Sequence, residues 1–194
     1  MMTEERALEI LAANVPPELM EHSIRVAETA VELAVRFAPE SVGKARVAGL
    51  LHDFCRGWSD DALLKTAEKI GLPMSPNARK HPVLIHGSVA VAVLREKFGL
   101  DDEDVLAAIT HHTVGKAGMS VLEKMIYLSD GAEAGRDYPG VEELRAAMRV
   151  SLDEGCLVAA RLTLRFLVEK GVPIEVGLID MHNECLESAR GGTA

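Results

Sequence analysis

Several histidines and acidic residues of this chain lie at helical spacing beside apolar residues, which directs their side chains toward a protein interior. His22, for example, shares a helix face with Val26 and Leu33. A single inward histidine is expected to be a core residue bonded to a carbonyl, but several together indicate a metal site. Imidazole and carboxylate ligands without thiolates suit iron, manganese or another divalent transition metal. The candidate ligands are His22, His52, Asp53, His86, His112 and Asp130.

Three of these candidates have a second possible ligand next to them in the sequence. His52 and Asp53 are adjacent at the end of an apolar segment, where Gly49 allows another helix to approach closely. An imidazole and a carboxylate that leave a helix roughly 100° apart can still converge on one cation. His112 continues an apolar helical face, whereas His111 does not. We therefore expect His112 to be a ligand and His111 to lie behind it or at the surface.

The overall composition excludes several other classes of protein. The 194 residues carry a net charge of −9, which opposes binding to nucleic acid. Three widely spaced cysteines without a Cys-x-x-Cys pair predict a reducing, cytoplasmic location and no thiolate zinc site. Cys55 is close enough to His52 to imitate a nucleophilic pair, but we expect it to be a small buried residue. No export signal or membrane-spanning segment is expected, because no apolar run approaches about 20 residues.

A hydrophobic period near 3.6 residues dominates the chain and predicts an all-α fold. We expect one domain over 1–187 with its core over about 16–187, followed by a disordered tail over 188–194. Glycine, three prolines and two basic residues predict a long loop over 71–82. Ser120 and Glu123 have the spacing of a capping box at a helix start. The expected helices cover about 3–13, 16–37, 41–55, 59–70, 83–97, 101–112, 120–129, 141–170 and 174–187.

The order of the ligands resembles the H…HD…D pattern of the HD-domain metal-dependent phosphohydrolases, an all-helical superfamily. His22, His52-Asp53 and Asp130 carry that pattern. Further strings resemble the bacterial YqeK-type branch, which comprises symmetrical diadenosine tetraphosphate hydrolases. The resemblance covers about 16–187. The strings are Leu50-Leu51-His52-Asp53, His86-Gly87, His112-Thr113-Val114-Gly115, Ala117-Gly118-Met119-Ser120 and Tyr127-Leu128-Ser129-Asp130 followed by Glu133 and Arg136.

This resemblance implies a centre of two divalent metal ions, with iron as the expected metal. His22, His52, Asp53 and Asp130 would hold one ion. His86 and His112 would hold the other, and Asp53 would bridge the two because a carboxylate has two oxygens. Such a pair of ions activates water and stabilises charge on a phosphoryl group.

A polyphosphate substrate also requires basic residues near the ligands. Arg136 and Lys116 are the candidates for catalysis together with Asp53, and Lys80, Lys116 and Arg136 for substrate binding, with Arg79 beside Lys80. Each of these basic residues could instead be an ordinary solvated charge.

The implied reaction is symmetrical hydrolysis of diadenosine tetraphosphate and related dinucleoside polyphosphates to two nucleoside diphosphates. The alternatives are a phosphohydrolase of mononucleotides or cyclic nucleotides, and a nucleotide-binding module without turnover. A module that had lost turnover would be expected to lack a ligand, and none of the six positions is missing. The oligomeric state stays open, with a homodimer among the options.

Overall fold

The chain forms a bundle of α-helices in the computed structural model, which describes residues 2–191. Within that range no β-strand occurs, so the predicted all-α fold class is confirmed. No described helix is both long and apolar enough to cross a membrane. The elements in chain order are α1 (Glu4–Asn14), α2 (Pro17–Phe37), η1 (Pro39–Ser41), α3 (Val42–Leu51), α4 (Asp60–Lys69), α5 (Pro76–Lys80), η2 (Pro82–Ile85), α6 (His86–Phe98), α7 (Glu103–His111), α8 (Val121–Ala132), α9 (Val141–Val150), α10 (Leu152–Lys170) and α11 (Val176–Gly191).

Hydroxyl side chains begin the helices where the sequence predicts. Thr3, Ser59 and Ser120 each accept a backbone N–H at the start of α1, α4 and α8. Ser120 and Glu123 form the predicted capping box, with both reciprocal hydrogen bonds present. These contacts satisfy donors that the first turn of a helix leaves unpaired.

Two predicted segments are divided differently in the structure. The expected helix over 141–170 is two helices, because Ser151 adopts an extended backbone and its hydroxyl accepts from Glu154 N at 3.0 Å to start α10. The predicted loop over 71–82 contains the short helix α5, with Ser75 as its N-cap and Pro76 in its first turn. In both cases a serine cap begins a helix inside a segment for which periodicity or composition predicts something else.

Two helix ends also differ from expectation. Helix α3 ends at Leu51 instead of Cys55, and just after its end the His52 ring donates to the Gly49 carbonyl at 2.7 Å. Helix α11 continues to Gly191, so the predicted disordered tail is wrong for residues 188–191. No helix breaker precedes Gly191 there. Residues 192–194 lie outside the described residues.

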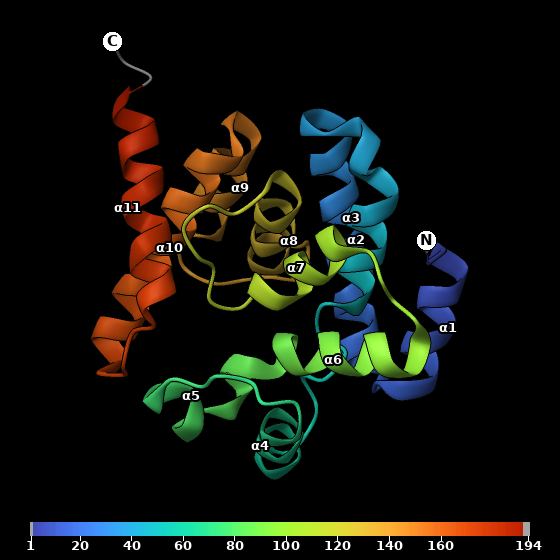
Figure 1. Cartoon of the computed structure of the whole chain (residues 1–194). Coiled ribbons are helices and arrows are strands. Elements are labelled where there is room, and N and C mark those ends of the chain that lie inside the picture. Colours follow the sequence, from blue (N-terminus) through green and yellow to red (C-terminus); the bar gives the residue numbers. More distant parts are fainter. Residues whose placement is uncertain (1, 192–194) are drawn as a thin grey trace.

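Helix α8 lies near the middle of the molecule (Figure 1), with α2 and α3 on one side and α9 to α11 on the other. It packs against α2, α3, α7, α9 and α10. One cluster of buried apolar side chains extends from Ala7 to Cys185 and includes Met125 and Leu128 of α8. The single domain over 1–187 stays a prediction, and this continuous core is what it requires.

The close contact of α2 with α3 depends on Gly49. A Cβ atom at Gly49 would lie 2.6 Å from the Cα of Ala27, too close for any real contact. We therefore expect Gly49→Ala to lower the free energy of unfolding by about 1–3 kcal/mol, the usual effect of overpacking. Gly43 lies on the same helix, and a Cβ atom added there would have nothing within 4 Å.

The matched control is therefore Gly43→Ala, which should be neutral or stabilise by up to about 1 kcal/mol, since alanine favours helices. Urea unfolding of both variants measures the difference. Equal stability of the two variants would contradict the close approach of α2 and α3.

Candidate metal centre

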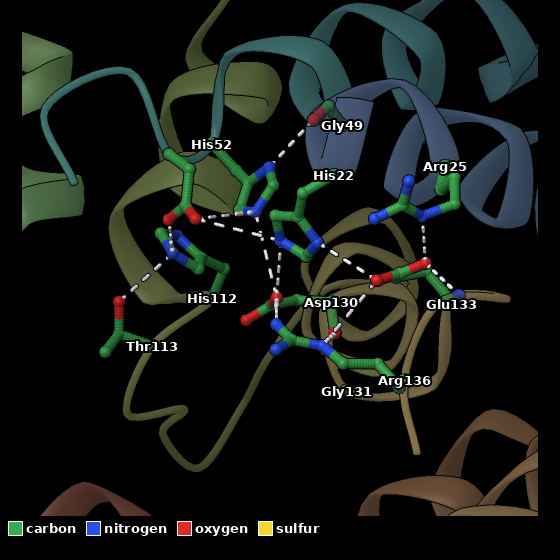
Figure 2. Close-up of polar contacts among 12 residues, drawn as sticks. His22, Arg25, Gly49, His52, His112, Thr113, Asp130, Gly131, Glu133 and Arg136 are labelled. Carbon is green, nitrogen blue, oxygen red and sulfur yellow. Dashed lines mark hydrogen bonds and ion pairs between the residues drawn. The ribbon is translucent and has the colours of Figure 1, made fainter. Parts of the chain in front are cut away.

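The six predicted ligands lie together where helices α2, α3, α6, α7 and α8 approach one another, and Figure 2 labels four of them, His22, His52, His112 and Asp130. His22 comes from the second turn of α2 and Asp130 from the last turn of α8. His52 and Asp53 follow α3, His112 follows α7, and His86 begins α6. The histidines that follow or begin helices are almost completely buried, with His52 at 0% exposure and His86 and His112 at 2% each.

Asp53 lies between two pairs of imidazoles. Its Oδ2 is 3.7 Å from His22 Nε2 and 3.6 Å from His52 Nε2. Its Oδ1 is 2.8 Å from His86 Nε2 and 3.4 Å from His112 Nε2. Each oxygen of this carboxylate therefore serves a different histidine pair, which is the arrangement that a bridging ligand needs.

Asp130 completes the first of these groups. Its Oδ1 lies 3.1 Å from His22 Nε2 and 3.8 Å from His52 Nε2. The potential ligand atoms of His22, His52 and Asp130 all lie within 4.8 Å of one another, and the same is true of His52, Asp53 and His112. Both groups can hold a cation.

The backbone fixes which nitrogen of three imidazoles faces the cluster. The Nδ1 atoms of His52, His86 and His112 lie 2.7, 2.6 and 2.7 Å from the carbonyl oxygens of the residues three positions earlier. A carbonyl only accepts, so each Nδ1 carries a proton and each ring turns its Nε2 inward. Metal-binding histidines are held in this way.

Among the described residues, two of the four inward nitrogens lack a hydrogen-bond partner. Within residues 2–191, the buried Nε2 atoms of His22 and His52 form no well-directed hydrogen bond. The Nε2 atoms of His86 and His112 are only 2.9 Å apart although both Nδ1 protons are already donated elsewhere. Two facing lone pairs repel unless a proton or a cation lies between them. The residues present therefore fit bound divalent cations.

The charges of the cluster also favour bound cations. Burial raises the pKa of Asp53, but the surrounding imidazoles, His52 first, outweigh it and hold that pKa well below its ordinary range. Burial also opposes ionisation of Asp130, yet His22 keeps its pKa low. Burial lowers the pKa of His52 to about 4. Two ionised carboxylates beside a neutral buried imidazole require compensating positive charge.

A second layer of side chains orients His22. Glu133 Oε1 lies 3.2 Å from His22 Nδ1, while Arg25 Nε donates to Glu133 Oε2 at 2.6 Å (Figure 2). Glu133 is 2% exposed and also accepts from Gly135 N at 2.5 Å. Sequence reasoning assigned no role to Arg25 or Glu133. Their spacing from the candidate ligands could have indicated a supporting role. Arg25 follows His22 by three residues and Glu133 follows Asp130 by three, a spacing that brings side chains to the same helix face.

The candidate basic residues lie at different distances from the cluster. Arg136 is half-buried, and its guanidinium donates to the Asp130 backbone oxygen at 2.7 Å and to the Asp130 carboxylate at 2.5 Å. Lys116 lies 3.5 Å from Glu123, which also binds His111 at 2.6 Å.

Arg79 and Lys80 are exposed at the end of α5, and Lys80 makes no polar contact with the six clustered residues in the described structure. Of the four candidate basic residues, Arg136 is the one that contacts a candidate ligand directly in the described part of the chain.

Two neighbouring residues fulfil their expected secondary roles. His111 is turned toward Glu123, outside the cluster, with its side chain 31% exposed. Cys55 is fully buried, and burial raises the pKa of its thiol to about 12. A thiol with so high a pKa is a poor nucleophile near neutral pH.

Comparison with known proteins identifies the family. The model of the "HD domain" family matches residues 19–160. The "Bis(5'-nucleosyl)-tetraphosphatase, symmetrical" of Staphylococcus aureus is 33% identical over 184 residues, which cover 94% of each chain. The protein of the same name from Bacillus subtilis is 32% identical over 173 residues, 89% of this chain and 92% of the relative.

A solved structure has the same fold. It is described as a "predicted HD superfamily hydrolase involved in NAD metabolism" from Clostridium acetobutylicum and superimposes with a TM-score of 0.91 at 32% identity, covering 97% of this chain and 99% of its own. With the family model matching most of the chain and the histidine and aspartate cluster in place, this chain belongs to the HD domain family.

Proposed function

We propose that this chain is a metal-dependent hydrolase that cleaves diadenosine tetraphosphate and related dinucleoside polyphosphates symmetrically, giving two molecules of ADP from the former. The position of Asp53 between two histidine pairs supports the metal dependence. The names of the relatives from Staphylococcus aureus and Bacillus subtilis support the substrate and the symmetrical cleavage.

The six clustered side chains would hold two divalent cations. His22, His52 and Asp130 would bind one, His86 and His112 the other, and Asp53 both. When bound, a pair of divalent cations activates water and stabilises negative charge on phosphoryl oxygens. Iron is the proposed metal, with manganese as the nearest chemical substitute, because the ligands are nitrogen and oxygen atoms only.

The chain's own basic residues would orient the polyphosphate. Arg136 lies against Asp130 and can extend the positive field of the site toward a phosphate with the part of its guanidinium that Asp130 leaves exposed. Lys116 is 40% exposed and adds a point charge from the loop after His112. Lys80 is placed farther out, on α5, and is proposed to contact the end of a long substrate.

Arg136→Ala should lower kcat/KM for diadenosine tetraphosphate by about 10- to 100-fold, since a hydrogen bond to a charged group contributes roughly 1.5–3 kcal/mol. Bound metal should not decrease, because the arginine and a cation would compete for the Asp130 carboxylate. Steady-state kinetics and elemental analysis measure both. Arg149→Ala is the control, since Arg149 is exposed on α9. Loss of metal in the Arg136 variant would instead assign this arginine to positioning Asp130.

A substrate panel tests the proposed function. The metal-loaded protein is incubated with diadenosine tetraphosphate, with ATP and ADP, and with a cyclic nucleotide, and the products are separated by chromatography. We expect turnover of the dinucleotide to exceed that of the others by at least about 10-fold. A preference for a mononucleotide or a cyclic nucleotide would assign the chain to another reaction of the same chemistry, and no turnover of any of them would make it a binding module.

The cellular location and the oligomeric state are also proposals. The described cysteines Cys55, Cys156 and Cys185 are all free, in keeping with a proposed reducing, cytoplasmic location. A homodimer stays a prediction for which sedimentation is the measurement.

A further inference from the structure

The end of α8 and the segment 132–136 that follows it (the α8 turn) carry three residues of the site. Asp130 lies in the last turn of the helix, Glu133 follows the helix directly, and Arg136 ends the α8 turn (Figure 2). Asp130 and Glu133 both lie within 3.2 Å of the His22 ring nitrogens, and Arg136 donates to the Asp130 carboxylate. The position of this backbone segment therefore decides where one side of the cluster lies.

The carbonyl oxygens at the end of α8 receive their hydrogen bonds from side chains. A helix leaves the carbonyls of its last turn without partners of its own, so each needs a donor from elsewhere. The Arg136 guanidinium donates to Asp130 O at 2.7 Å, and the Tyr138 hydroxyl donates to Gly131 O at 2.8 Å. The next two carbonyls along the chain belong to the α8 turn.

One arginine of α9 supplies donors to both of these carbonyls. Arg145 Nε donates to Ala132 O at 2.9 Å. Its Nη2 donates to Glu133 O at 2.7 Å and to Arg136 O at 2.9 Å. A guanidinium is planar and its donors diverge in a fixed fork, so three oxygens bound to it at once must keep their relative positions. Arg145 therefore holds the beginning and the end of the α8 turn together.

The charge of Arg145 also suits this position. The carbonyls at the C-terminus of a helix carry partial negative charge, which favours a cation beside them. The Arg145 side chain is only 18% exposed, and its Nη1 donates to Glu142, an acid of α9 that is 80% exposed. An ion pair with so exposed a partner contributes little. The main partners of Arg145 are therefore the backbone oxygens of the α8 turn.

We infer that Arg145 is a positioning residue of the candidate metal centre, which acts through the α8 turn to place Asp130, Glu133 and Arg136. Among the described residues it makes no polar contact with the six predicted ligands. The inference rests on the proposed function, because it names a residue that supports the proposed cation site. Its effect should be confined to the side of the centre that contains Asp130, since the imidazoles of the other side are held by their own backbone carbonyls.

The first test measures the α8 turn without metal. Arg145→Lys keeps the charge but loses the fork, because an ammonium group is a single point charge. Amide hydrogen exchange is followed by NMR at the N–H groups of Glu133, Gly135 and Arg136, which are hydrogen-bonded at this helix end. Their exchange should become about 10- to 100-fold faster, the effect of losing a hydrogen bond to a charged group. Glu142→Gln removes only the exposed ion pair and should exchange normally.

A second measurement separates positioning from stability. Mn²⁺ is titrated by calorimetry into the metal-free Arg145→Lys protein. One of the two cation positions should bind about 10- to 100-fold more weakly and the other should be unchanged, because loss of an outer support weakens the ligand that it holds. Met148→Ala is the matched control. It removes a buried side chain from the same helix, so it should lower the melting temperature and leave both affinities unchanged.

Unchanged exchange in the α8 turn of the Arg145 variant would overturn the inference. Faster exchange with both Mn²⁺ affinities unchanged would also overturn it, since Arg145 would then stabilise the helix end alone. Selective loss of one cation position in a protein that does not hydrolyse the dinucleotide would retain the role of Arg145 and remove the proposed reaction. An unchanged parent protein that binds no Mn²⁺ would contradict the proposed function, whereas the exchange measurement would still decide whether Arg145 holds the α8 turn.

Discussion

Asp53→Asn is expected to empty both cation positions and to lower turnover by about 10³-fold or more. Asparagine keeps the shape of the side chain but loses the charge and one of the two carboxylate oxygens that lie between the histidine pairs. The stabilisation that a divalent cation gives to a phosphoryl group amounts to several kcal/mol, and each 1.36 kcal/mol corresponds to a factor of ten. Elemental analysis and kinetics of the purified variant measure the two effects.

A second cluster variant and a surface control test whether the effect belongs to Asp53. His86→Ala should reduce the metal content by about half, because the contacts of His86 within the cluster are with Oδ1 of Asp53 and the His112 imidazole, on one side of Asp53. Asp101→Asn replaces an exposed acid before α7 and should change neither metal content nor turnover. Full metal content in the Asp53 variant would contradict the bridging assignment.

Removal of metal is expected to destabilise the protein, and more strongly at higher pH. A cation present at about 1,000 times its dissociation constant stabilises the native state by roughly 4 kcal/mol. For a chain of this size that corresponds to a melting temperature higher by about 8–16 °C. Thermal unfolding with and without added Mn²⁺ measures the difference.

The pH dependence follows from two imidazoles of the metal-free protein. Burial lowers the pKa of His22, and burial also lowers that of His112, but Asp130 and Asp53 respectively outweigh it and leave both values raised above 6.5. Stability from a raised pKa is present below 6.5 and is lost as the pH rises through the native-state values. Bound cations replace those protons, so they protect against this loss.

The stabilisation by Mn²⁺ should therefore be larger at pH 8.5 than at pH 7. The Asp53→Asn protein is the control and should show little stabilisation at either pH. A larger effect of the metal at pH 7 would contradict the exchange of protons for cations at these imidazoles.

The sequence predicted which histidines and aspartates come together better than it predicted the side chains that support them. The histidines at 22, 52, 86 and 112 continue an apolar helical spacing in the sequence, and that spacing directs such residues inward. The contact of Arg25 with Glu133 joins α2 to the end of α8, more than 100 residues later in the chain, and a surface ion pair would have the same local pattern. Such a partner is identified only after the two helices have been placed.

Some helix boundaries are likewise predictable from the local sequence, and others are not. Helix starts at Thr3, Ser59 and Ser120 depend on hydrogen bonds within four residues, so the local sequence predicts them. The break at Ser151 is not predictable in this way, because helical periodicity continues through it and no glycine or proline marks it. The short helix α5 escapes prediction because prolines are typical of loops, although Pro76 is in the first turn after a serine cap.

The cluster around Asp53 is proposed to hydrolyse the central bridge of a dinucleoside tetraphosphate. The direct measurement is an early time course of diadenosine tetraphosphate hydrolysis by the metal-loaded protein in water enriched in oxygen-18, followed by chromatography and mass spectrometry. ADP is expected as the only primary product, with one labelled oxygen for every two ADP molecules. ATP and AMP as primary products, or an unchanged dinucleotide, would contradict it.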